Sequence, residues 1–274
     1  MRLVFIALIT ILALTSCSSK FAKVLKSKDY VAKLKTADEY YAKGNYGKAE
    51  ALYMELFPVY KGTDKFEDLY YKYAYCSYYQ ENYGDAANLF KGFLEVFPIS
   101  KNAEDVSYMY AYCFFRQAPR VELEQVNTLK AMGLMQTFIN THPNSKRIPE
   151  ANKVIEKGHQ KLELKEYNAA ALYFKISQYR AAAISFNTLL NNYPESPKAD
   201  MYKLMSIKAY YQFAKLSISS KQEERYSKVV SEYNDFTDRF PDSKLLKEAE
   251  SYNTLSLSHI KTLQYEQTPS STER

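Results

Sequence analysis

The 274-residue sequence contains no tryptophan, only seven glycines, three cysteines and three histidines. Few glycines, and no alternating Val, Ile and Thr runs bounded by turn residues, argue against a β-sheet protein. Three cysteines are too few for a disulfide framework. The histidines His142, His159 and His259 are far apart and have no Cys or carboxylate at metal-ligand spacing, so no metal site is predicted.

Motifs that would indicate chemistry are also missing. The chain has no glycine-rich phosphate loop and no Gly-x-Ser-x-Gly elbow. We therefore expect a protein that is not an enzyme, with no cofactor and no small-molecule substrate. The net charge of +6 is spread along the chain with Lys, Asp and Glu interspersed, which favours a solvated helical surface over a nucleic-acid-binding stripe. No nucleic-acid partner is expected.

The first residues resemble a bacterial lipoprotein signal. Arg2 is the only charge before an apolar run of about a dozen residues, which ends in Leu14-Thr15-Ser16-Cys17. Such a run suits a signal peptide and is shorter than the roughly 20 residues of a membrane-spanning helix. Residues 1–16 are thus predicted to be cleaved and Cys17 to carry covalent lipid, which leaves residues 17–29 as a lipidated tether. The alternative is a plain secretory signal that happens to contain a cysteine.

The lipid would hold the chain to a bilayer, since several acyl chains together bind almost permanently. No aspartate follows Cys17, which favours sorting to the outer membrane over retention at the inner membrane. The predicted location is the outer membrane, lipid-anchored and facing the periplasm.

The rest of the chain is organised as helical repeats. Apolar residues recur at three- and four-residue spacing, and an aromatic residue or histidine followed by proline is predicted to end a helix in each of five units. These pairs stand at Phe57-Pro58, Phe97-Pro98, His142-Pro143, Tyr193-Pro194 and Phe240-Pro241. We predict a repeat domain over 30–263, with units at about 30–61, 65–98, 102–143, 148–194 and 197–241, a capping helix at 244–263 and a disordered tail at 264–274.

Two of the units match the tetratricopeptide pattern of aromatic, small and closing proline residues, and the first unit matches it until a closing proline that comes early. In the second unit these are Tyr70, Tyr73, Ala74, Tyr83, Ala86, Phe90, Phe93 and Pro98, and Ala170 to Pro194 repeats the offsets in the fourth. The predicted fold is an all-α tetratricopeptide-repeat solenoid of about five helix-turn-helix units. In the third and fifth units the small residue and the proline are 32 residues apart instead of 24, so we expect longer loops or extra helical turns around 117–127 and 216–225. The linker 144–165 is predicted to be helical.

A lipobox followed by five such repeats resembles the BamD family of outer-membrane lipoproteins. The resemblance is carried by Ala37 to Phe57 and by Tyr173 to Pro197, and it extends over roughly 14–263. It implies a non-catalytic component of the β-barrel assembly machinery whose partners are unfolded outer-membrane proteins and the barrel-forming subunit. In that family the amino-terminal repeats are thought to receive the substrate's targeting strand, and the carboxy-terminal repeats to dock the barrel-forming subunit. The 27 tyrosines of this chain are more than the family pattern implies.

Aromatic residues suggest where a peptide would bind. The repeat offsets place one aromatic stripe on two neighbouring helices, with Arg116 as a clamp for a carboxylate. The stripe consists of Tyr71, Tyr75, Tyr78, Tyr108, Tyr112 and Phe115. An equally good interpretation is that these rings are core packing. Cys76 and Cys113 share one offset in consecutive units and are expected to be two small buried residues, because helix axes about 8–10 Å apart place them too far for a disulfide.

Other functions fit parts of the pattern. A periplasmic tetratricopeptide adaptor for cell-envelope processes usually has an amino-terminal coiled coil, which this chain lacks. A glycan-binding platform on the same repeats would use tryptophan, which is absent. A cell-wall enzyme would need an acid or nucleophile in a cleft.

Overall fold

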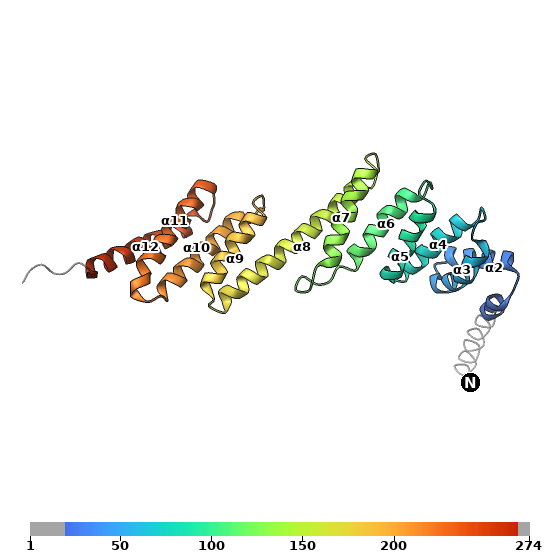
Figure 1. The fold of residues 1–274 in the computed structure, drawn as a ribbon, viewed down its shortest axis with the longest axis horizontal. Helices are drawn as coiled ribbons and strands as arrows, with labels where there is room; N and C mark the ends of the chain where they lie inside the picture. Colours follow the sequence, from blue (N-terminus) through green and yellow to red (C-terminus); the bar gives the residue numbers. More distant parts are fainter. Residues whose placement is uncertain (1–19, 268–274) are drawn as a thin grey trace, which may run out of the picture. The chain divides into compact units, whose positions relative to one another are not determined.

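The computed structural model describes residues 20–267, and all regular structure within them is helical (Figure 1). The predicted lipid site Cys17 and residues 268–274 lie outside this range. Residues 20–26 are helical, and eleven longer helices follow. Their bounds are α2 Tyr30–Ala42, α3 Tyr46–Tyr60, α4 Phe66–Tyr79, α5 Tyr83–Val96, α6 Ala103–Arg116, α7 Val126–Thr141, α8 Ile148–Lys175, α9 Tyr179–Asn192, α10 Ala199–Lys215, α11 Ser219–Arg239 and α12 Leu246–Gln267.

The helices form two compact units, one up to His159 and one from Gln160 onward, and the boundary falls within α8. In the first unit consecutive helices from α2 to α7 pack against each other, and in the second unit consecutive helices from α9 to α12 do so. This consecutive packing of antiparallel helix pairs is the arrangement of tetratricopeptide repeats. The protein is therefore an all-α tetratricopeptide-repeat protein, as the sequence predicted.

Small residues stand where the paired helices meet. The alanines at the repeat position of the first helix, Ala37, Ala74, Ala111, Ala170 and Ala209, have no exposed surface. A methyl group at these sites lets the helix backbones approach closely, and the space around them is filled by buried aromatic and aliphatic side chains of the second helices.

The tight turns inside three repeats share one backbone geometry. Gly44, Glu81 and Ser177 follow the first helix with φ values of 72°, 63° and 62°, in the left-handed region. The next amide, that of Asn45, Asn82 or Gln178, donates to the carbonyl five residues back at 2.8 to 3.0 Å. This is the Schellman closure of a helix end, so the turn satisfies carbonyls that the helix leaves open.

A serine clasp closes the turn between repeats. Ser100, Ser145, Ser196 and Ser243 each follow the helix-ending proline by two residues, and each hydroxyl donates to a carboxylate on the preceding first helix. The acceptors are Glu67, Glu104, Glu163 and Asp200. Each serine Oγ also accepts from the amide two residues later, which orders the start of the next repeat.

The first of the five predicted proline stops is wrong. Pro58 lies inside α3, which continues to Tyr60. The helix continues because Tyr60 is buried and its hydroxyl donates to the Tyr30 carbonyl at 3.3 Å. These contacts offset the backbone hydrogen bond that Pro58 cannot donate in the last turn. No serine clasp forms at this turn.

The extended repeats accommodate their extra residues differently. In the third repeat the stretch between Arg116 and Val126 is a loop, in which the buried Gln125 side chain donates to the carbonyls of Arg120 and Leu123. In the fifth repeat only residues 216–218 separate α10 and α11, and the extra residues lengthen α11 to 21 residues. The predicted helical linker is the first part of the 28-residue α8.

Both ends of the repeat domain differ from the predicted bounds. Phe21, Val24 and Leu25, within the predicted tether, pack against the core of the first unit, and the Phe21 ring lies 5.9 Å from that of Tyr40. Helix α12 runs four residues past Leu263, into the predicted tail. None of the described helices is both long enough and apolar enough to cross a bilayer.

Candidate functional site

The aromatic stripe is continuous across α4 and α6. Ring centroids are 4.8 Å apart for Tyr71 and Tyr75 and 5.7 Å apart for Tyr108 and Tyr112. Tyr78 connects the two helices, because its ring centroid lies 6.2 Å from that of Tyr75 and 6.4 Å from that of Tyr112. Phe115 completes the row at 5.5 Å from Tyr112. All six residues therefore belong to one cluster, as their repeat offsets require.

Burial divides the stripe into a packed part and an accessible part. Tyr75 and Tyr108 each keep only 7% of their surface exposed and belong to the core of the first unit. Tyr71, Tyr78, Tyr112 and Phe115 are half-buried and pack against that core. An incoming chain can touch the four half-buried rings, whereas the two buried rings support them from below.

A carboxylate that the sequence pattern did not single out anchors rings of both parts of the stripe. The hydroxyls of Tyr71 and Tyr75 both donate to Asp105 Oδ2, the first at 2.9 Å. Arg147 Nη2 lies 2.5 Å from Asp105 Oδ1, and its guanidinium covers the Tyr108 ring at 4.6 Å. Asp105 lies in the first turn of α6. It thereby holds two rings of α4 and the guanidinium of Arg147, which comes from the turn between α7 and α8.

The same surroundings raise the pKa of two of the phenols. Burial, followed by the charge of Asp105, raises the pKa of Tyr71 to about 12 despite the hydrogen bond with Tyr75 and the nearby Arg147. Burial also raises the pKa of Tyr75 well above its usual value, and hydrogen bonding to Asp105 adds to the effect. The stripe offers hydroxyl and ring surface, which suits an apolar or aromatic peptide.

Arg116 stands at the end of the stripe, in the last turn of α6. Its guanidinium stacks on the Tyr83 ring at 4.6 Å, and Nη2 lies 3.9 Å from the exposed carboxylate of Glu81. Its side chain is 38% exposed. Such a long, exposed ion pair contributes little and is readily exchanged, so this guanidinium can turn to a carboxylate brought by a ligand.

Asp105, Arg147 and Tyr83 are the neighbours that sequence reasoning missed. Asp105 lies in the first turn of α6, where an acidic residue already has a sufficient local role at the helix N-terminus. Arg147 is 42 residues away from it along the chain, and no spacing rule connects the two. Tyr83 is the first residue of α5, as Tyr46 is of α3. This shared repeat position was the one sequence signal that could have identified Tyr83.

The two cysteines of the repeats are free and fully buried, as predicted. Burial raises the pKa of each thiol to about 12, so both are unreactive at neutral pH. Within residues 20–267, no group of three or more His, Cys, Asp or Glu side chains could hold a metal ion.

The chain was compared with curated proteins and with solved structures. The chain matches no curated protein. Among solved structures it is similar to the TPR2AB domain of yeast Sti1 in a complex with pHSP90, with 14% identity, a TM-score of 0.39, and coverage of 86% of this chain and 97% of that one. It is also similar to a human IFIT1 dimer with PPP-AAAA, with 15% identity, a TM-score of 0.26, and coverage of 83% and 58%.

The family comparison is the informative one. The model of the YfiO family, described as outer membrane lipoprotein, matches residues 28–225. The match includes the aromatic stripe and every repeat up to the first turns of α11, and it confirms the predicted resemblance to BamD. This chain belongs to the YfiO family of outer membrane lipoproteins.

Proposed function

We propose that the protein is a non-catalytic, lipid-anchored scaffold that assists assembly and insertion of β-barrel proteins into the outer membrane. It would face the periplasm, held by lipid on Cys17, and bind both unfolded barrel substrates and the barrel-forming subunit. The observation that carries the proposal is the family match over residues 28–225, and the lipobox ending at Cys17 agrees with it.

Affinity purification of the carboxy-terminally tagged chain from gently solubilised membranes tests this function. We expect a large outer-membrane β-barrel with periplasmic repeat domains among the proteins recovered. Recovery of cell-wall or other envelope proteins without that barrel would instead support the alternative function, a periplasmic tetratricopeptide adaptor for cell-envelope processes.

Within this function, the accessible part of the aromatic stripe is the proposed peptide-binding groove. The four half-buried rings would contact the apolar side chains of an extended segment, and Arg116 would pair with its carboxylate. These rings are Tyr71, Tyr78, Tyr112 and Phe115. The half-buried state of these rings and the exposed guanidinium support this assignment. Tyr75 and Tyr108 would act indirectly, by holding the rings above them.

Peptide binding in solution tests the groove. We expect a peptide ending in an aromatic residue with a free carboxylate to bind more tightly than its amidated form, and Arg116→Gln to remove that difference. The matched control is Arg120→Gln, an exposed arginine of the same unit. Tyr112→Ala should weaken both peptides, since it removes ring contact. Equal affinity of all variants for both peptides would contradict the groove and leave the scaffold function untouched.

A further inference from the structure

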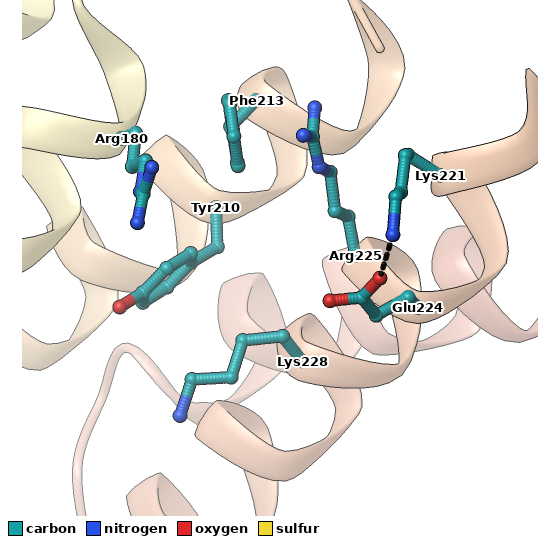
Figure 2. Close-up of a pocket in the computed structure, with 7 residues that line it drawn as sticks. All are labelled: Arg180, Tyr210, Phe213, Lys221, Glu224, Arg225 and Lys228. Atoms are coloured by element: carbon teal, nitrogen blue, oxygen red, sulfur yellow. Dashed lines mark hydrogen bonds and ion pairs between the residues drawn. The ribbon is translucent and has the colours of Figure 1, made fainter. Parts of the chain in front are cut away.

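The second unit contains an open cavity of about 540 Å³ to which α9, α10 and α11 contribute side chains (Figure 2). It is lined by four cations, one carboxylate and two rings. These are Arg180, Tyr210, Phe213, Lys221, Glu224, Arg225 and Lys228. We call this the cationic pocket.

Two of the four cations are already neutralised. Lys221 Nζ lies 3.1 Å from Glu224 Oε2, and Lys228 Nζ lies 2.7 Å from Glu232 Oε1. The guanidiniums of Arg180 and Arg225, in contrast, form no ion pair with any carboxylate among the described residues. The pocket therefore keeps two uncompensated positive charges, both on side chains with the planar fork that matches a carboxylate.

Arg225 is held ready for a ligand. Its guanidinium lies over the Phe213 ring at 4.0 Å, and Nη1 donates to Ser217 Oγ in the loop between α10 and α11. Stacking and a hydrogen bond to a neutral hydroxyl fix the direction of the group without using its charge. Figure 2 shows Arg180 and Arg225 on either side of Phe213.

The two rings supply the apolar part of the lining, and exposed aliphatic side chains lie on the loop next to it. Tyr210 and Phe213 present half-buried ring surface, and Lys228 Nζ lies 5.6 Å from the centre of the Tyr210 ring. On the loop beside Ser217, Leu216 and Ile218 are 70% and 72% exposed, although both are large aliphatic side chains. A ligand that matches this surface combines negative charge with apolar groups.

We propose that the cationic pocket binds an acidic segment of a partner protein, with a carboxylate side chain between Arg180 and Arg225 and adjacent apolar side chains on the rings and on Leu216 and Ile218. A bare phosphate ion would leave the rings and the aliphatic side chains exposed. A membrane surface would contact Leu216 and Ile218 but could not fill a concave site whose rim also carries Glu224. An acidic peptide satisfies the charge, the concavity and the apolar margin together.

Paired synthetic peptides test the proposal. One is a 12-residue peptide in which Asp and Glu alternate with Leu and Phe, and the other has Asn and Gln in place of the acids. We expect the full chain to bind the acidic peptide about tenfold more tightly, with a preference that declines as salt is added. The double variant Arg180→Glu, Lys221→Glu should abolish this preference.

The control is Lys244→Glu, Lys247→Glu, which makes the same change of charge at exposed positions near the start of α12. It should keep the preference. Both double variants replace exposed side chains. Thermal midpoints equal to that of the natural chain would show that both variants fold. The milder Arg180→Gln should reduce the preference without reversing charge.

Three results would overturn the proposal. The first is equal affinity for the two peptides, and the second is an equal loss in pocket and control variants. The third is pocket-dependent binding of phosphatidylglycerol vesicles or inorganic phosphate that is stronger than binding of the acidic peptide. The pocket would serve any envelope partner of this chemistry, so its failure would leave the barrel-assembly experiment unaffected.

Discussion

Lys203 and Glu232 form a buried ion pair between α10 and α11, with Nζ 2.6 Å from Oε2 and side-chain exposures of only 5% and 6%. Lys228 and Asn187 also donate to Glu232, and Lys203 contacts Asp235 as well. The pair thus lies at the centre of a network that joins α9, α10 and α11. Lys228 connects this network to the cationic pocket, since it lines the pocket and pairs with Glu232.

Removing the cation of this pair should be costly. We expect Lys203→Met to lower the free energy of unfolding by about 3–5 kcal/mol, because a buried carboxylate would lose its closest partner. Lys208→Met is the matched control on the same helix, where the pair with Glu248 is partly exposed and a loss of about 0–1 kcal/mol is expected. Urea unfolding followed by circular dichroism measures both values, and equal losses would contradict a special role for Lys203.

The same network predicts how stability depends on acid. Burial alone would raise the pKa of Glu232, but hydrogen bonds from Lys203 and Lys228 outweigh burial and hold the pKa below its usual value of 4.5. A lowered pKa in the folded state means that the stabilisation is complete above about pH 4.5 and is lost as pH falls through the folded-state pKa.

Replacement of this carboxylate should therefore make the stability of the protein less dependent on pH below pH 4.5. We expect Glu232→Gln to be less stable than the natural chain at pH 7, and the difference to shrink steadily below pH 4.5. Thermal midpoints between pH 3 and pH 7 show this. Glu250→Gln, at an exposed position of α12 with no ion pair among the described residues, should leave the difference from the natural chain small throughout. If the difference in thermal midpoint between Glu232→Gln and the natural chain stays constant with pH, the lowered pKa of Glu232 is refuted.

Helix pairing was predictable because it depends on local periodicity. Alanines such as Ala74 and Ala170 mark the contact of two helices through their position in the repeat, so their burial follows from spacing alone. Pro58 was misread because a proline in the last turn of a helix and one just past its end look alike in sequence. The burial of Tyr60 distinguishes them, and burial depends on the fold.

Side-chain partners across repeats were not predictable in the same way. The prolines that end helices were recognised from the sequence, but Glu67 is 33 residues before the Ser100 that it binds, so the clasp forms only after the helices are stacked. The stripe shows the same limit. Its rings were placed together by their offsets, whereas the burial of Tyr75 and its bond to Asp105 depend on the neighbouring repeat.

The left-handed turns predict a pair of opposite mutational effects. Ser177 adopts φ of 62° at the position where Gly44 has 72°, and a side chain is disfavoured in this region. We expect Ser177→Gly to stabilise the protein by roughly 0.5–1 kcal/mol and Gly44→Ser to destabilise it by about 1 kcal/mol. Ser227→Gly, in the interior of α11, should instead cost about 0.5–1 kcal/mol, since glycine weakens a helix. Thermal unfolding measures the stability of the three variants. Destabilisation by Ser177→Gly would be incompatible with this turn geometry.

Thiol chemistry tests the buried cysteines and the lipid anchor in one experiment. Cys76 and Cys113 have no exposed surface, and burial raises the pKa of each thiol to about 12, so the native protein should not react with Ellman's reagent at pH 8. In denaturant the membrane-purified protein should titrate two thiols, because lipid on Cys17 blocks the third. Cys76→Ser should leave one thiol. Three thiols in the denatured natural chain would show that Cys17 carries no lipid, and rapid reaction of the native protein would show that the repeats open at the junction of α4 and α6.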